Sequence, residues 1–529
     1  MTDRRQFLQH LGIGVLILGA TSPLTQCQSE KSPEASIPLD PLALPRSTPE
    51  QQGISSEAIL QFLADIKTSG IEFHSFMLVR KGHVVAEGWW DPYGPHLKHT
   101  LYSLSKSFTS TGIGMLVAEG KLSVEDQVLS FFPEYAPAEV SENLGAMKIK
   151  HLLTMTTGHG QDTMGALRSA EDNIWVKAFL ARTVDFEPGT HFLYNTGATY
   201  MLSAILQKQS GQTLFDYLSE RLFVPLGIDG ADWETCPMGI NTGGYGLRVR
   251  TEDIAKLGQL YLQKGEWKGK QLLPATWVEE ATKKQTNSQE GDNDWSQGYG
   301  YQFWRCKPAP GFYRGDGAFG QYCIVIPQKE TVLAITSESF DMQASMQIAW
   351  DNLLPALSDE KIAENTSSYQ LLSEKLKQLK LDPPMLAASS PKAAEVSGKS
   401  FKLATNDWEI QTVSFQFTDQ DCTFTLQDAK GSQQIMCGLS AWIIDRNERS
   451  EERSLFAVPG RTTVPSQIAA SATWKDENTL QMTWRFIENA HHDQIDCTFD
   501  GDKVVISFKN SVAIGRKQED ERMNLTGQA

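Results

Sequence analysis

The chain has 529 residues, of which 40% are hydrophobic and 21% are charged, a composition typical of globular proteins. A chain of this length is expected to form two or three domains. The formal net charge of −16 at pH 7 argues against a nucleic-acid-binding protein, because that function needs a basic surface. A small-molecule substrate remains compatible with this charge.

The N-terminal residues 1–27 have the pattern of an export signal. Arg4 and Arg5 precede an apolar stretch, residues 11–20, that is too short to span a bilayer. The basic pair resembles a twin-arginine signal; an ordinary signal peptide with two basic residues is the alternative. A lipobox-like tetrapeptide predicts lipidation of Cys27, although glutamine replaces the small residue usual before that cysteine. We therefore expect an exported protein that is periplasmic or held in the membrane by a lipid on Cys27.

Six further cysteines are widely spaced and lack the pairing typical of a metal site. They are Cys236, Cys306, Cys323, Cys422, Cys437 and Cys497. We expect most of them to be thiols of the core, and the spacing leaves open one disulfide in either half of the chain.

The composition divides the rest of the chain into four segments. Residues 28–45, rich in Ser, Pro and Glu, are expected to form a tether. Residues 46–357 mix strand and helix patterns and form the first predicted domain. Residues 358–397 are polar and predict a linker. Residues 398–529 contain short alternating strands separated by turn residues, which predict an antiparallel sandwich or small barrel, an all-β module.

Two predicted hairpins bracket the first domain, at residues 76–86 and 321–336. A long and mostly helical segment separates them. The simplest solution is one antiparallel sheet built from both hairpins and flanked by helices at residues 55–68 and 346–357. The sequence therefore predicts an α+β fold with a large helical insert.

The chemistry is predicted at Ser103 and Lys106. A serine hydroxyl is a weak nucleophile at neutral pH and needs a base to accept its proton. In an S-x-x-K motif on a helix, the two side chains share one face and can touch. The apolar residues that follow predict a helix starting here, where the N–H of Ser103 can help to bind an oxyanion. A second S-x-x-K, at Ser389 and Lys392, lies in a stretch without a helical pattern and is not expected to react.

The segment at residues 188–197 is the strongest candidate for a partner of this pair. A Pro-Gly turn and a predicted helix at residues 197–207 place Tyr194 on a fixed loop. A nearby lysine cation would lower the pKa of the phenol, which makes Tyr194 a candidate general base or acid. The alternative is a packing residue with a solvated hydroxyl.

Taken together, these motifs resemble the serine beta-lactamase/transpeptidase-like superfamily, in the branch of class C beta-lactamases, DD-peptidases, family VIII esterases and 6-aminohexanoate-dimer hydrolases. The similarity covers residues 46–357. Its ordered motifs are LYSLSKSFTS at 101–110, IKHLLTMTTGH at 149–159, PGTHFLYN at 188–195 and YLQKG at 261–265. The resemblance implies Ser103 as nucleophile, Lys106 as proton acceptor and positive charge, and Tyr194 as partner base. It implies no metal and no organic cofactor.

Two positions depart from the pattern of the family. In its Y-x-N motif the third position is Thr196 here, with Asn195 one residue earlier, and both are candidate substrate-binding residues. Its K-T-G or H-x-G motif corresponds to Gly315, Asp316 and Gly317, also candidates for substrate binding. In beta-lactamases and peptidases the cation of that motif holds the substrate carboxylate, so its absence makes such substrates less expected.

Two neighbouring features complete the predicted site. The resemblance implies that the N–H of Ala318 forms the oxyanion hole together with the N–H of Ser103. Arg314 is expected to be a surface residue; the alternative is that it supplies a cation nearby. The sequence His491-His492-Asp493 is expected to be a solvated turn, with a metal-binding fragment as the alternative.

We therefore expect an exported serine hydrolase that cleaves a small ester or amide through an acyl-enzyme on Ser103. One alternative is a DD-peptidase or beta-lactamase acting on cell-wall-like or beta-lactam amides, which the glycine at 315 disfavours. Another is a non-catalytic binding or sensor protein on the same scaffold, which has no need for the Ser, Lys and Tyr together. No nucleic-acid partner is expected, and membrane contact is expected only through Cys27.

Overall fold

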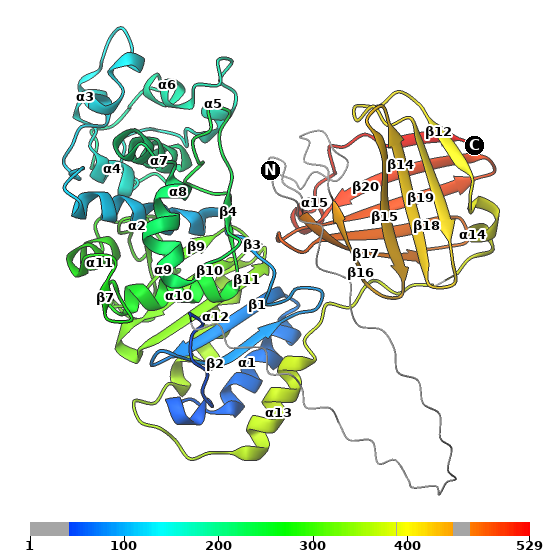
Figure 1. The fold of residues 1–529 in the computed structure, drawn as a ribbon, viewed down its shortest axis with the longest axis horizontal. Helices are drawn as coiled ribbons and strands as arrows, with labels where there is room; N and C mark the ends of the chain where they lie inside the picture. The colour runs from blue at the N-terminus through cyan, green and yellow to red at the C-terminus, as the bar shows by residue number, and fades with distance from the viewer. Residues whose placement is uncertain (1–41, 388, 448–465) are drawn as a thin grey trace, which may run out of the picture. The chain divides into compact units, whose positions relative to one another are not determined.

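The computed structural model describes residues 42–387, 389–447 and 466–529 (Figure 1). The predicted export signal, Cys27 and most of the predicted tether lie outside these ranges and stay predictions. Within the described ranges, none of the helices has the length and apolar character needed to cross a membrane. The six cysteines of the described part are buried free thiols, as expected for most of them, and form no disulfide there.

A six-stranded antiparallel sheet forms the centre of the N-terminal domain, in the order β2-β1-β11-β10-β9-β8 (Figure 1). Its strands are β1 (Glu72–Arg80), β2 (His83–Trp89), β8 (Trp304–Arg305), β9 (Tyr313–Gly317), β10 (Gln321–Ile326) and β11 (Thr331–Glu338). The pairing of β1 with β11 joins the two hairpins, with Glu72 opposite Glu338 and Arg80 opposite Thr331. The prediction of one antiparallel sheet made from two distant hairpins is confirmed.

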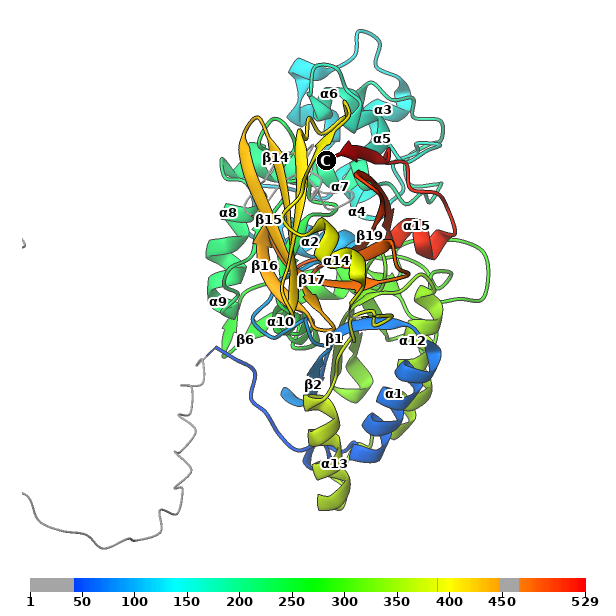
Figure 2. The ribbon, with the colours of Figure 1, turned by 90° about the vertical axis from the view of Figure 1, so that its right-hand side faces the viewer.

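Helices cover both faces of this sheet because its strands bury apolar side chains on each side. Phe76 and Leu78 face a core that they share with α1 (Ser56–Ser69) and α12 (Met342–Asn352), which lie side by side (Figure 2). Met77 and Val79 belong to the other core. The helices of that second side are α2 (Ser105–Ala118) and α10 (Thr251–Leu262).

The predicted helical insert lies between the two hairpins and holds short helices around one long helix, α7 (Thr196–Ser210). The other helices are α3 (Glu142–Ala146), α4 (Ile149–Leu153), α5 (Met164–Arg168), α6 (Trp175–Leu180), α8 (Leu214–Leu218), α9 (Val224–Leu226) and α11 (Ala275–Thr282). Short strands connect them. β3 (His99–Thr100), β5 (Leu247–Val249) and β4 (Asp232–Trp233) form a three-stranded sheet, and β6 (Glu266–Trp267) pairs with β7 (Lys270–Gln271). The side chains of this insert share the core cluster that lies beneath α2.

The predicted linker is partly structured. Helix α13 (Thr366–Lys377) begins at the cap Asn365 and buries Leu372 in the core beside α1 and β2. A second short helix, α14 (Pro391–Val396), begins inside the second S-x-x-K motif and contains Lys392, although the sequence shows no helical pattern there. Part of the segment that the sequence predicts as a linker therefore packs as part of the N-terminal domain.

The C-terminal residues 398–529 are here called the β module, and their described part (398–447 and 466–529) forms one ten-stranded sheet. Its strands are β12 (Ser400–Leu403), β13 (Thr412–Phe417), β14 (Asp421–Asp428), β15 (Gly431–Leu439), β16 (Ile443–Asn447), β17 (Ser466–Trp474), β18 (Thr479–Phe486), β19 (His492–Asp500), β20 (Lys503–Asn510) and β21 (Leu525–Gln528), with one helix, α15 (Ser511–Arg516). A parallel pairing of β15 with β17 closes the sheet, which confirms the predicted small barrel. Trp474 and Trp484 are buried in its core.

Candidate active site

Ser103 lies in a single 3-10 turn (Tyr102–Leu104) directly before α2. The N–H of Leu104 donates to the carbonyl of Leu101 at 3.1 Å, which closes this turn. Ser103 is half-buried, whereas Lys106 on the first turn of α2 is only 1% exposed. The Nζ of Lys106 donates to the Oγ of Ser103 at 3.0 Å. The spacing that predicted contact between these two side chains therefore does bring them together.

The ammonium group of Lys106 is enclosed by polar atoms, and the charges of Asp162 and Asp316 are near enough to favour its protonated form. Its Nζ donates to the carbonyl of Gly244 at 2.8 Å and lies 3.5 Å from the Oγ1 of Thr196. Burial lowers the pKa of Lys106 to about 7, against the opposing influence of Asp162 and Asp316, because the uncharged amine needs less solvation. A large share of Lys106 is therefore neutral near pH 7 and can accept a proton.

Tyr194 stands over this pair, on the loop that precedes α7. Its ring centroid lies 4.9 Å from the Nζ of Lys106, and its ring stacks on Trp304 with centroids 5.5 Å apart. Burial raises the pKa of the phenol, and the charge of Asp316 raises it further, while a hydrogen bond with Ser103 opposes them. The expectation of a lowered pKa is wrong, because desolvation of the buried phenol outweighs the influences that lower the pKa. Tyr194 is therefore a neutral proton donor in the resting site.

The two candidates that follow Tyr194 are placed differently. The hydroxyl of Thr196 faces Lys106, and its backbone N–H donates to Asp162 at 3.0 Å. Asn195 is fully buried, and its amide oxygen accepts hydrogen bonds from the N–H and the hydroxyl of Thr163 at 3.1 and 2.9 Å. That oxygen also accepts a hydrogen bond at the start of α7, from the N–H of Ala198. Asn195 thus anchors the helix start, and Thr196 is the residue beside the reacting pair.

The inner strand β9 packs its glycines directly against the turn that carries Ser103. A Cβ at Gly315 would overlap Leu104 and lie 2.5 Å from the Oγ of Ser107. A Cβ at Gly317 would overlap the carbonyl oxygen of Leu101. Gly317 therefore lies against the backbone of the Ser103 turn, and Gly315 lies against the buried side chains of Leu104 and Ser107. This packing leaves no room for a lysine or histidine at Gly315 to hold a substrate carboxylate.

Ala318 follows β9 and is exposed, in the tight turn between β9 and β10. Its carbonyl oxygen accepts a hydrogen bond from Gln321 at 3.0 Å, which fixes the peptide of this turn. Because Gly317 touches the turn of Ser103, the structure places Ala318 beside that turn. The pairing of Ser103 and Ala318 as oxyanion donors stays a prediction that this placement fits.

Arg314 and Asp316 form a buried ion pair on the opposite face of β9. The Nε of Arg314 lies 2.9 Å from Asp316, and its guanidinium also lies 3.8 Å from Asp294. Arg314 is 0% exposed, so the expectation of a surface arginine is wrong. Its charge is neutralised within the protein, which makes it unsuitable as a substitute for the missing cation. Burial raises the pKa of Asp316 above its ordinary value, against the pull of Arg314.

The expectation of a solvated turn at residues 491–493 is also wrong. His491 is 2% exposed and Asp493 is 0% exposed. Within the described ranges, side-chain atoms of Glu72, Glu338 and His492 come within 4.8 Å of one another, the spacing of a possible metal site. However, Arg485 already neutralises Glu72, and His491 donates to Glu338 at 2.6 Å. We therefore interpret this cluster as an ion network rather than a metal centre.

Three contributors to the site could not be found from the motifs. Asp162 lies in the loop after the IKHLLTMTTGH segment, Gly244 contributes only a carbonyl, and Trp304 on β8 stacks on Tyr194. None of the three is part of a sequence motif, because each is brought to the site by the folding of a distant loop or strand.

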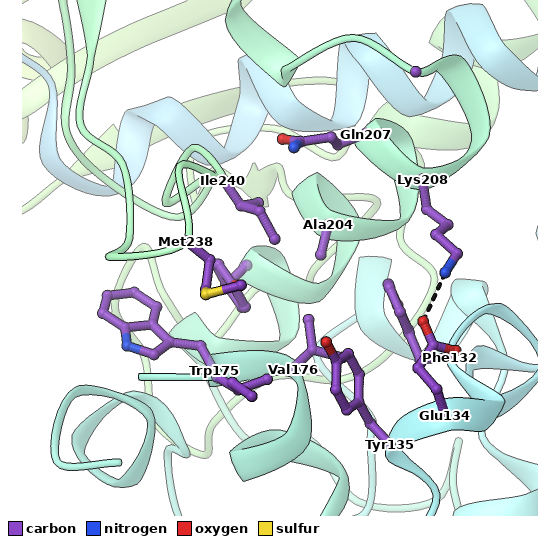
Figure 3. Close-up of a pocket in the computed structure, with 13 residues that line it drawn as sticks. Phe132, Glu134, Tyr135, Trp175, Val176, Ala204, Gln207, Lys208, Met238 and Ile240 are labelled. Carbon is purple, nitrogen blue, oxygen red and sulfur yellow. Dashed lines mark hydrogen bonds and ion pairs between the residues drawn. The ribbon is translucent and has the colours of Figure 1, made fainter. Parts of the chain in front are cut away.

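A cavity of about 420 Å³ lies elsewhere in the helical insert (Figure 3). Its lining includes Trp175 and Met238, and an ion pair joins Lys208 to Glu134 at its edge. None of the predicted catalytic residues lines it. This cavity is therefore separate from the candidate active site.

The sheet, its two helical layers and the Ser-Lys-Tyr cluster define a hydrolase of the beta-lactamase fold class. Residues 61–358 match the family model described as Beta-lactamase, and the chain belongs to this family. Membership of this family supports a hydrolytic enzyme.

Individual relatives are distant. The chain is 23% identical over 309 residues to 6-aminohexanoate-dimer hydrolase from Paenarthrobacter ureafaciens, covering 54% of this chain and 78% of that protein. It is 27% identical over 167 residues to D-aminopeptidase from Brucella anthropi, covering 29% and 31% respectively. A crystal structure of a family VIII carboxylesterase is similar with a TM-score of 0.44 and 16% identity, over 58% of this chain and 99% of the other. The chain thus spans about a third of the D-aminopeptidase.

Proposed function

We propose that the protein is a serine hydrolase that cleaves a small ester or amide through an acyl-enzyme on Ser103. The observation that carries the proposal is the 3.0 Å contact between the Nζ of Lys106 and the Oγ of Ser103, with the pKa of that lysine lowered to about 7 by burial. A nucleophile in contact with a base that is partly neutral at physiological pH is the arrangement that serine acylation needs.

Each proposed step has a donor and an acceptor in the site. Neutral Lys106 takes the hydroxyl proton as the Oγ of Ser103 bonds to the carbonyl carbon. The N–H groups of Ser103 and Ala318 stabilise the negative charge on the substrate oxygen. The phenol of Tyr194 then protonates the departing alkoxide or amine and regains a proton from the ammonium of Lys106. Neutral Lys106 then takes a proton from a water molecule as that water attacks the acyl carbon. The bond from the acyl carbon to the Oγ of Ser103 breaks, the acid leaves, and the ammonium of Lys106 returns the proton to the Oγ.

Neutral substrates fit this site better than substrates that carry a carboxylate. The position that holds a cation in beta-lactamases and peptidases is Gly315 here, and Leu104 and Ser107 occupy the space beside it. Arg314 is committed to Asp316. Acidic side chains at Asp162 and Asp316 add negative potential around Lys106. A beta-lactam or D-alanyl peptide is therefore the less favoured substrate.

The proposal includes export, with the chain anchored by a lipid on Cys27. Its support is the arginine pair, the apolar stretch and the lipobox-like sequence of residues 1–27. Cell fractionation of the wild type and of Cys27→Ser tests it. Loss of the protein from the membrane fraction on substitution is the expected result, and an unchanged distribution would contradict anchoring at this residue.

A panel of short neutral esters, simple amides and a penicillin tests the hydrolase proposal, with Ser103→Ala as the matched variant. Turnover of an ester that disappears in Ser103→Ala is the expected result. Turnover of the penicillin alone would favour the beta-lactamase alternative. Absence of turnover together with absence of fluorophosphonate labelling would favour a binding protein.

A further inference from the structure

A turn of the β module reaches the backbone that carries Ser103. This turn, residues 487–491, joins β18 to β19. The hydroxyl of Tyr102, the residue before Ser103, lies 2.7 Å from the Nε2 of His491 and 3.1 Å from the Oδ1 of Asn489. The covalent neighbour of the nucleophile is thus tethered by two side chains that lie almost 390 residues further along the chain.

The backbone at Tyr102 needs such a tether. Its φ is +47°, in the left-handed region that residues other than glycine seldom adopt. A residue other than glycine is strained in that region and keeps the conformation only where its surroundings enforce it. The hydrogen bonds of the Tyr102 hydroxyl supply part of that enforcement, and the next peptide carries the N–H of Ser103.

The second proposed oxyanion donor has a neighbour of the same kind. Phe319 follows Ala318 and has a φ of +64°. Its ring meets His491 edge to face, with centroids 4.6 Å apart at an interplanar angle of 89°. The rings of Phe319 and Tyr102 also pack against each other, with centroids 5.4 Å apart. One imidazole therefore touches the residues that flank both proposed donors.

The second ring nitrogen of His491 contacts a carboxylate of the N-terminal domain. This nitrogen, Nδ1, lies 2.6 Å from the Oε1 of Glu338, at the end of β11. Burial would raise the pKa of Glu338, but hydrogen bonds from His491 and His492 lower it to about 2, so this group is a carboxylate. A carboxylate accepts, so Nδ1 carries a proton and Nε2 faces Tyr102. The ring orientation is fixed at both nitrogens.

The rest of the turn is anchored to the strand that leads into the site. The N–H of Thr100 on β3 donates to the carbonyl of Glu488 at 3.1 Å. The hydroxyl of Tyr93 donates to the carbonyl of Asn489 at 3.2 Å. The turn therefore joins the N-terminal domain through backbone as well as side-chain hydrogen bonds, close to Ser103.

We propose that His491 of the β module is a positioning residue for the oxyanion hole: it holds Tyr102 and Phe319, and through them it orients the N–H groups of Ser103 and Ala318. This inference rests on the proposed function and assigns the β module a part in the active site. A misoriented donor binds the developing oxyanion poorly but leaves ground-state contacts in place. Loss of the tether should therefore lower kcat and leave KM nearly unchanged.

The test compares the full-length variants Tyr102→Phe and His491→Phe and their double variant. Each single change removes the hydrogen bond from one end, and phenylalanine at 491 keeps a ring against Phe319. We expect each to lower kcat for a short neutral ester about tenfold to a hundredfold, less than the loss of a whole oxyanion donor, which costs about a hundredfold to a thousandfold. The double variant should be no slower than the slower single one, because both remove the same contact.

Two further variants separate positioning from folding. Tyr93→Phe removes a hydrogen bond to the same turn without touching the Ser103 turn, and should change kcat less than twofold. His491→Gln places an amide within reach of Tyr102, so its kcat should be higher than that of His491→Phe and lower than that of the wild type. Thermal melting identifies any variant that fails to fold. Tyr102→Phe changes no residue of the β module, so it keeps the test valid if His491→Phe unfolds.

The outcomes distinguish this inference from the function on which it rests. Activity that survives in Ser103→Ala would overturn the proposed function. A second outcome would overturn only the positioning role. In that outcome activity depends on Ser103, but Tyr102→Phe and His491→Phe are as active as Tyr93→Phe. Multiplicative effects in the double variant, or a rise in KM instead of a fall in kcat, would also overturn it.

Discussion

Asp162 is the nearby charge that most favours protonation of Lys106, and the variant Asp162→Asn removes it. Burial lowers the pKa of Lys106 from 10.5 to about 7, with Asp162 and then Asp316 opposing the change. The asparagine keeps the oxygen that accepts the N–H groups of Thr196 and Met164, so the loop geometry should persist. Without the opposing charge, the pKa of Lys106 should fall further.

The magnitude of the wild-type effect follows from that pKa. Each pKa unit corresponds to about 1.4 kcal/mol. Lowering the pKa from 10.5 to about 7 therefore means that the site destabilises the ammonium form, relative to the neutral amine in water, by about 5 kcal/mol. Only the neutral amine accepts the proton of Ser103. The active fraction should therefore be about half at pH 7, about a tenth at pH 6 and about a hundredth at pH 5.

The assay is kcat/KM for a short neutral ester between pH 5 and pH 9. The kcat/KM of the wild type should rise about tenfold per pH unit below pH 7 and level off above it. In Asp162→Asn this rise should occur at lower pH. Asp172→Asn, which removes an exposed acid paired with Lys177, is the matched control and should leave the profile in place. Three outcomes would refute the assignment of Lys106 as the base. They are a rise of kcat/KM centred near pH 10, a kcat/KM that does not depend on pH, and equal shifts of the profile in Asp162→Asn and in the control.

Three further predictions address the rest of the site. Tyr194→Phe should lower kcat about a hundredfold or more, because it removes a proton donor to the leaving group, and steady-state kinetics will show it. Gly315→Ala should lower the melting temperature, since its Cβ would overlap Leu104; Gly165→Ala, whose Cβ meets nothing within 4 Å, should not. For the wild type, kcat/KM for a short neutral ester should exceed that for a penicillin or a D-Ala-D-Ala peptide, and the opposite order would show that another group binds the carboxylate.

Local patterns predicted the parts of the fold and site that depend on neighbouring residues. The S-x-x-K spacing is a property of one helical turn, so it gave the contact between Ser103 and Lys106 correctly. The apolar runs of the two hairpins gave the strands, and the simplest way to pair these hairpins gave the single sheet. The turn residues between short strands gave the closed β module in the same way.

The parts that could not be predicted depend on distant contacts. Arg314 sits in a short polar strand that is typical of an exposed edge, and its burial depends on Asp294 from a remote loop. His491 lies in a polar tripeptide typical of a solvated turn, yet Glu338 and Tyr102 enclose it. The pKa of Tyr194 was misjudged because desolvation is set by the complete fold, whereas the nearby lysine charge was visible from the motifs.

The central claim is that Ser103 is the nucleophile, and mapping the site of covalent modification tests it most directly. The full-length protein is treated with a fluorophosphonate probe, digested, and analysed by mass spectrometry. One adduct, on the peptide that contains Ser103, and no adduct in Ser103→Ala are the results that the account predicts. An adduct on a different serine, or undiminished labelling of Ser103→Ala, would contradict it.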